Sequence, residues 1–64
     1  MQNEGWPEIG SRWRNTRNHS TYVVTEHIVT ATGARIVKFR FDGRTRDHFL
    51  GLAEWHIRME KENG

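Results

Sequence analysis

An alternating stretch in the middle of the chain constrains its fold more than any other segment. Apolar and cationic residues alternate from Val37 to Phe41, a period typical of a strand with one buried and one solvated face. The pair Asp42-Gly43 comes next and predicts a tight turn, because glycine accepts the positive φ angles that other residues avoid. The predicted strands of this β-hairpin are 34–41 and 44–50.

Two earlier segments also have the composition of strands. Ser11–Arg14 alternates with Trp13 facing inward, which predicts a short first strand. Thr21–Thr30 is dense in β-branched residues, which favour strands. Both faces of this second segment carry apolar side chains, so either face is a candidate for the core, and the pattern favours a bulge near Glu26-His27.

The period changes in the last fourteen residues, from Gly51 onward. Leu52, Trp55 and Met59 are spaced at i, i+3 and i+7, which is the spacing of one apolar face on a helix. Two structures fit this spacing: a short α-helix, or a single 3₁₀ turn that leads into a last strand at 57–60.

Together these elements predict a mainly β domain over residues 10–60, a four-stranded antiparallel meander with one short C-terminal helical element. We expect this meander to close into a small SH3-like barrel, because closure removes exposed strand edges. An open three-stranded sheet with one helix across it is the alternative. Residues 1–9 are expected to form an extended arm, since Pro7 disfavours a helix before it, and 61–64 a frayed tail.

The core of so short a chain must come from a few large side chains. A domain of 64 residues buries only about 60% of the surface that its unfolded chain exposes. Support from a homodimer or a partner surface is therefore expected. The predicted core residues are Trp13, Tyr22, Val24, Val37, Phe39, Phe41, Phe49, Leu52 and Trp55.

Several classes of site and location are disfavoured by what the chain lacks. It has no cysteine, which excludes disulfides and thiolate chemistry and suits a reducing compartment. No apolar run approaches the roughly 18 residues of a membrane span, and the N-terminus does not have the pattern of a signal peptide. We therefore expect a cytoplasmic protein without a membrane partner.

No catalytic or metal-binding pattern stands out. The four histidines lack close ligand spacing, the serines lack a nucleophile elbow, and the six glycines are dispersed rather than gathered in a phosphate loop. We expect no enzyme, no metal ion and no cofactor. The histidines are His19, His27, His48 and His56.

Charge is segregated along the chain. Residues 11–46 carry eight cations against only Glu26 and Asp42, whereas the net charge of the whole chain is +2. Most of the cations are arginines, whose planar fork suits phosphate and carboxylate. We call the predicted binding surface the basic face; its residues are Arg12, Arg14, Lys38, Arg40, Arg44 and Arg46.

Weak motifs along residues 10–60 resemble those of a class of short phage and prophage accessory proteins. The class has a Trp-Arg pair near the start, a Tyr-x-Val stretch next, and an Arg-x-Leu-x-x-Phe-like stretch near the end. In this chain the last of these corresponds to the stretch Arg46-x-x-Phe49-Leu50-x-Leu52-x-Glu54-Trp55. Gly51 and Trp55 stand where that class has proline and phenylalanine. The resemblance implies a small SH3-like barrel and an origin in a mobile element, and it transfers no functional residue. The matching residues are Trp13-Arg14, Tyr22-Val23-Val24 and Arg46 to Leu50.

Two partners fit the basic face. The first is an acidic protein surface, which would make the chain a non-enzymatic module that binds and modulates a host or defence complex. The alternative is nucleic acid, held without much sequence preference through its phosphates, with Tyr22, Trp6 or His48 stacking on a base if exposed. A solvated face whose charges only maintain solubility is the plainest interpretation.

Overall fold

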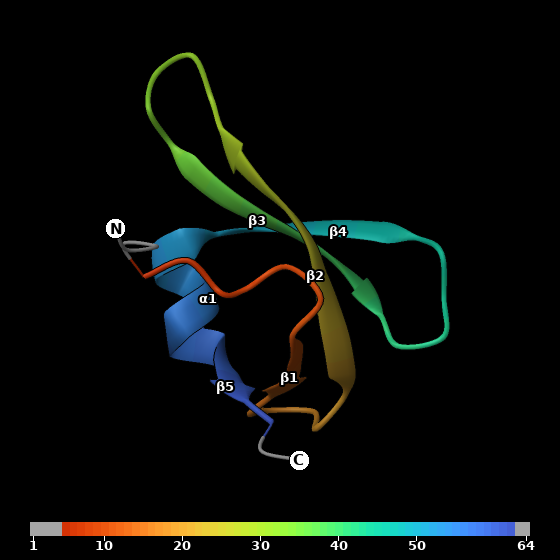
Figure 1. The fold of residues 1–64 in the computed structure, drawn as a ribbon. Coiled ribbons are helices and arrows are strands. Elements are labelled where there is room, and N and C mark those ends of the chain that lie inside the picture. Colours follow the sequence, from red (N-terminus) through yellow and green to blue (C-terminus); the bar gives the residue numbers. More distant parts are fainter. Residues whose placement is uncertain (1–4, 63–64) are drawn as a thin grey trace.

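The computed structural model describes residues 5–62, which form one five-stranded antiparallel sheet and one helix (Figure 1). The order of the strands is β4-β3-β2-β1-β5, so chain neighbours pair along a meander and the last strand returns to the first. This confirms a mainly β fold with one short C-terminal helix. The elements are β1 (Arg12–Asn15), β2 (Thr21–Val29), β3 (Arg35–Phe41), β4 (Asp47–Gly51), α1 (Leu52–Arg58) and β5 (Met59–Lys61).

The sequence left open whether the C-terminal segment forms an α-helix or a last strand, and the structure contains one of each. A seven-residue α-helix ends at Arg58, and Met59 then has extended backbone angles that begin a fifth strand. The meander therefore has five strands rather than four. Lys61 lies opposite Trp13 in this pairing, although the predicted tail began at residue 61. Residues 63–64 of that tail and 1–4 of the predicted arm lie outside the described residues.

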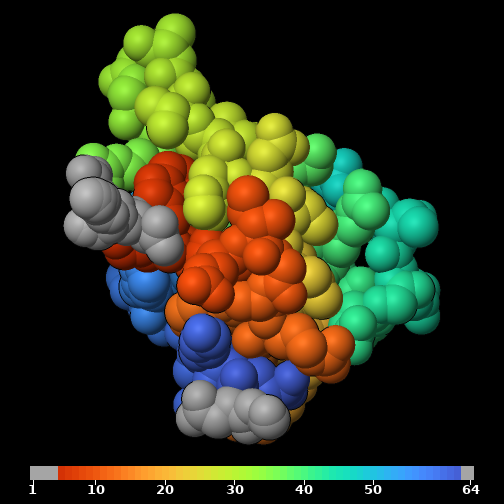
Figure 2. All heavy atoms as spheres, in the orientation of Figure 1, coloured from red at the N-terminus to blue at the C-terminus, as the bar shows by residue number. Residues whose placement is uncertain are grey.

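The expected bulge in β2 is present and decides which side chains face inward. The register shifts between Val24 and Glu26, so Thr25 is the extra residue, and its hydroxyl donates to the Lys38 carbonyl oxygen at 3.1 Å. Beyond the bulge His27 lies opposite Val37 on the inner face, and Ile28 is left on the outer face. Figure 2 shows that the tip of the β2–β3 hairpin projects beyond the body of the protein.

The core is built where α1 closes over the inner face of the sheet. Trp55 is fully buried, with its ring centre 5.0 Å from that of Phe39 and 5.5 Å from that of Trp13. Its indole nitrogen Nε1 has no hydrogen-bond partner among residues 5–62. The buried residues are Val24, Val37, Phe39, Trp55 and Met59, and the half-buried ones against them are Trp6, Trp13, Tyr22, Leu50 and Leu52.

Two predicted core residues lie elsewhere. Phe49 is 58% exposed, because the β3–β4 register sets it opposite Lys38 on the outer face while His48 and Leu50 face inward. Phe41, the last residue of β3, is only half-buried and does not belong to the core cluster.

The N-terminal arm packs against the body from Gly5 onward. Trp6 stacks on His27 with ring centres 4.5 Å apart, and Pro7 is buried. Hydrogen bonds join ring nitrogens to the arm's carbonyl oxygens, from His27 to Pro7 and from His56 to Gly5. The arm therefore covers one side of α1 and β2 and holds Trp6 half-buried.

Candidate anion-binding cleft

Acidic side chains neutralise the part of the basic face that lies on β1. Arg12 forms ion pairs with Asp42 at 2.9 Å and with Glu62 at 3.0 Å. These contacts hold the pKa of the Arg12 guanidinium above its ordinary value. The hydrogen bond to Asp42 has the largest effect, and the hydrogen bond to Glu62 the next largest. Arg14 lies 3.8 Å from Glu60. These two arginines are thus already engaged within the protein.

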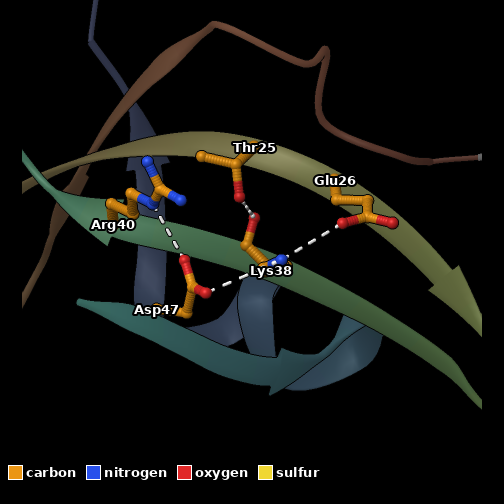
Figure 3. Close-up of polar contacts among 5 residues, drawn as sticks. All are labelled: Thr25, Glu26, Lys38, Arg40 and Asp47. Carbon is orange, nitrogen blue, oxygen red and sulfur yellow. Dashed lines mark hydrogen bonds and ion pairs between the residues drawn. The ribbon is translucent and has the colours of Figure 1, made fainter. Parts of the chain in front are cut away.

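Lys38 and Arg40 on β3 are also paired with carboxylates (Figure 3). Arg40 donates from Nε to Asp47 at 2.8 Å. Lys38 lies between two carboxylates, at 3.6 Å from Asp47 and 3.3 Å from Glu26. The cross-strand register causes this grouping, because it sets Arg40 opposite Asp47 and Lys38 opposite Glu26. The outer face of the sheet is therefore a network of ion pairs rather than a row of free cations.

The Asp47 carboxylate makes part of the stability pH-dependent. The hydrogen bond from Arg40, with the charge of Lys38, holds the pKa of Asp47 below its ordinary value, although partial burial opposes the shift. A carboxyl whose pKa is lower in the folded protein stabilises the fold above its unfolded pKa, about 3.9 for aspartate. This stabilisation is lost as the pH falls through the lower folded value.

We expect Asp47→Asn to destabilise the protein near neutral pH and much less in acid. The measurement is urea unfolding of wild type and variant from neutral pH to below about pH 3.9, the ordinary aspartate pKa. The difference in unfolding free energy between wild type and variant should shrink as the pH falls. Asp47 of the wild type then becomes protonated, so position 47 is uncharged in both proteins. A difference that stays constant over this range would contradict the role given to Asp47.

A cleft of about 320 Å³ lies where the start of β2, the end of β3 and the β3–β4 loop meet. The loop starts with the predicted turn, since the Arg44 N–H donates to the Phe41 carbonyl oxygen at 2.9 Å and Gly43 has a φ of +82°. Residues 44–46 do not continue as a strand, so the predicted second strand begins later, at Asp47. We call this the anion-binding cleft; its lining residues are Ser20, Tyr22, Phe41, Arg44, Arg46 and His48.

Aromatic rings form one wall of the cleft. Tyr22 and Phe41 are cross-strand partners whose ring centres lie 5.5 Å apart. The His48 ring centre is 6.1 Å from that of Tyr22. The Arg44 guanidinium lies over the Phe41 ring at 5.8 Å, an arrangement in which the ring quadrupole attracts the cation. A cation is thus held beside a flat apolar wall.

In the described part of the chain, the polar side-chain groups of the cleft form no hydrogen bond or ion pair, and Arg44 contacts only the Phe41 ring. Among residues 5–62, no carboxylate pairs with Arg44 or Arg46, and the side chains of Ser20, Tyr22 and His48 form no hydrogen bond. The other four cations of the basic face all have carboxylate partners. Two guanidinium forks, two hydroxyls and an imidazole beside aromatic rings suit an anion that carries a planar group.

Sequence reasoning found most of these groups without finding the cleft. It named Arg44 and Arg46 as cations and Tyr22 and His48 as stacking groups, but the structure brings them together apart from the rest of the basic face. Trp6, the third stacking candidate, lies against His27 instead. Phe41 had been assigned to the core, and Ser20, just before β2, had no distinguishing signal.

No protein-family model, curated protein or solved structure matches the chain. The resemblance to phage accessory proteins therefore stays a prediction. Within residues 5–62, no three His, Asp or Glu side chains gather as they would around a metal ion. The single helix of this region is too short to cross a membrane.

Proposed function

We propose that the protein is a small non-enzymatic module that binds single-stranded nucleic acid through the anion-binding cleft. The observation that carries this proposal is that Arg44 and Arg46, the two cations of the basic face without a carboxylate partner among residues 5–62, lie beside the Tyr22 and Phe41 rings. Arginine binds phosphate through its planar fork, and aromatic side chains stack on bases of any sequence. The cleft offers both at once.

The aromatic wall favours a nucleic acid over an acidic protein. Carboxylate side chains would use the arginines but leave the rings without a flat partner. A single strand is favoured over a duplex, since the bases of a duplex are stacked with each other and do not reach a protein ring. The volume of about 320 Å³ is at the low end of ligand pockets, about 300–1,000 Å³. The cleft therefore suits one nucleotide of a longer strand.

The number of free cations sets the expected strength of binding. For a single strand, log K falls with log salt with a slope of about −0.7 for each phosphate neutralised. Contacts from Arg44 and Arg46 alone therefore predict a slope of about −1.4 and weak affinity. A chain that used all six cations of the basic face would give about −4.2, so the slope distinguishes the cleft from the whole face.

The test is fluorescence anisotropy of labelled single-stranded DNA and RNA, titrated with protein over a salt series. We expect both to bind with the shallow slope given above, and the matching duplex to bind more weakly. Polyaspartate is the matched competitor, because it carries charge without bases, and it should displace the strand poorly. Absence of binding at low salt would overturn the proposal and leave an acidic host or defence protein as the partner to seek.

A further inference from the structure

The two edges of the sheet differ in how well they are protected against pairing. β5 forms one edge; it has three residues, and both Glu60 and Lys61 are charged. Short charged edges resist the addition of another strand. β4 forms the other edge with five residues, and among residues 5–62 it has no strand on its outer side. Only the β5 edge has the protection that monomeric sheets usually carry.

Apolar side chains lie on the outer face of the sheet at and near the unprotected edge. Phe49, at the centre of β4, is exposed on the outer face. Towards one end of this face Ile36 lies opposite Gly51, and Ile28 lies opposite Ile36. A Cβ atom added to Gly51 would meet nothing within 4 Å apart from its chain neighbours, so the space at this position is open. The edge thus presents both unpaired backbone groups and apolar surface.

We propose that the β4 strands of two copies pair antiparallel about a two-fold axis through Phe49, forming one sheet across a homodimer. With Phe49 on the axis, Asp47 of each copy lies opposite Gly51 of the other, where there is no side chain to oppose it. The two Asp47 carboxylates are then at opposite ends of the pairing, and each is already neutralised by Lys38 and Arg40. The pairing therefore sets no two like charges opposite each other, and the short sequence of β4 can pair with itself.

The pairing satisfies the outer backbone groups of β4 and brings the two exposed phenylalanine rings together. Directly opposed residues on an antiparallel pair have Cα atoms about 4.5–5.5 Å apart, so aromatic pairs contact across it. A two-fold interface uses the same patch on both copies, which fits a strand whose central residue is its most exposed apolar one. This dimer does not depend on nucleic acid and is tested without it.

The first test is the mass in solution, measured by sedimentation equilibrium from micromolar to millimolar concentration. Wild type is expected to approach twice the 7.6 kDa of the chain as concentration rises. Phe49→Lys would place the lysine cations of the two copies opposite each other on the two-fold axis, so this variant should remain monomeric. Ile57→Lys is the control, because Ile57 is 72% exposed on α1, away from the edge, and it should dimerise like wild type. A wild type that stays monomeric throughout would overturn the proposal.

The second test locates the axis. The protein has no cysteine, so single-cysteine variants report proximity without background. Phe49→Cys should form an intermolecular disulfide rapidly under mild oxidation, since the expected Cα separation falls within the roughly 4.4–6.8 Å that a disulfide spans. Ile57→Cys should crosslink at least tenfold more slowly. Equal rates for the two variants would show that the copies meet elsewhere and would overturn the β4 pairing.

Discussion

Replacing Phe39 with alanine is expected to leave most of the protein unfolded at room temperature. Phe39 is 6% exposed and its ring contacts those of Trp55, Tyr22 and His48. Truncating a buried phenylalanine typically costs about 3–5 kcal/mol, because transfer free energy is lost and a cavity remains. At roughly 0.05–0.15 kcal/mol per residue, a chain of 64 residues has only about 3–10 kcal/mol of stability in total.

The matched control is the same substitution at Phe49. Its side chain is exposed on the outer face, so Phe49→Ala should change the stability of the monomer by no more than about 0.5 kcal/mol. Urea unfolding of both variants at low protein concentration, followed by tryptophan fluorescence, makes the comparison. Similar losses at the two positions would contradict the assignment of inner and outer faces.

Reversing the two cleft charges is expected to remove nucleic-acid binding while the fold is retained. Hydrogen bonds that involve a charged group contribute about 1.5–3 kcal/mol each, and each 1.4 kcal/mol is a tenfold change in affinity. Arg44→Glu with Arg46→Glu should therefore weaken binding of a single strand at least about 100-fold. The two side chains form no ion pair within residues 5–62, so the substitution breaks no carboxylate contact there.

The control reverses the same number of charges away from the cleft. Arg14 and Arg17 are both exposed, and Arg14 is only loosely paired with Glu60. Because Arg14→Glu with Arg17→Glu gives the same net charge, any effect of overall charge on anisotropy appears in both variants. Loss of affinity by the same factor in both would show that the whole surface, and not the cleft, attracts the strand.

The fold was largely predictable because strand periodicity and turn residues are local signals. The alternation in β3 and the Asp42-Gly43 turn are both present. The face of the sheet on which Phe49 lies could also have been predicted from the sequence. A two-residue turn at Asp42-Gly43 would already have set Phe49 opposite Ile36, on the outer face. Phe49 was wrongly assigned to the core because it is hydrophobic. The residue opposite it across the hairpin would have assigned it to the outer face.

The candidate site was less predictable because it depends on partners distant in sequence. Arg12 is neutralised by Asp42 and Glu62, which lie 30 and 50 residues away along the chain. Counting basic residues identifies all the cations but cannot separate those that fold against a carboxylate from those that do not. Only the strand register and the return of β5 to β1 make that separation. Within the described part of the chain, they leave Arg44 and Arg46 beside the aromatic rings without a carboxylate partner.

The packing of Trp13 against Trp55 gives the protein an optical signature. Two indoles with ring centres 5.5 Å apart and planes inclined by 65° couple their electronic transitions. Such exciton coupling produces circular dichroism bands of opposite sign in the far ultraviolet, superimposed on the signal of the backbone. The spectrum will therefore misreport the strand content if it is read as backbone alone. Because one indole belongs to β1 and the other to α1, loss of the couplet on heating marks the moment when the helix leaves the sheet.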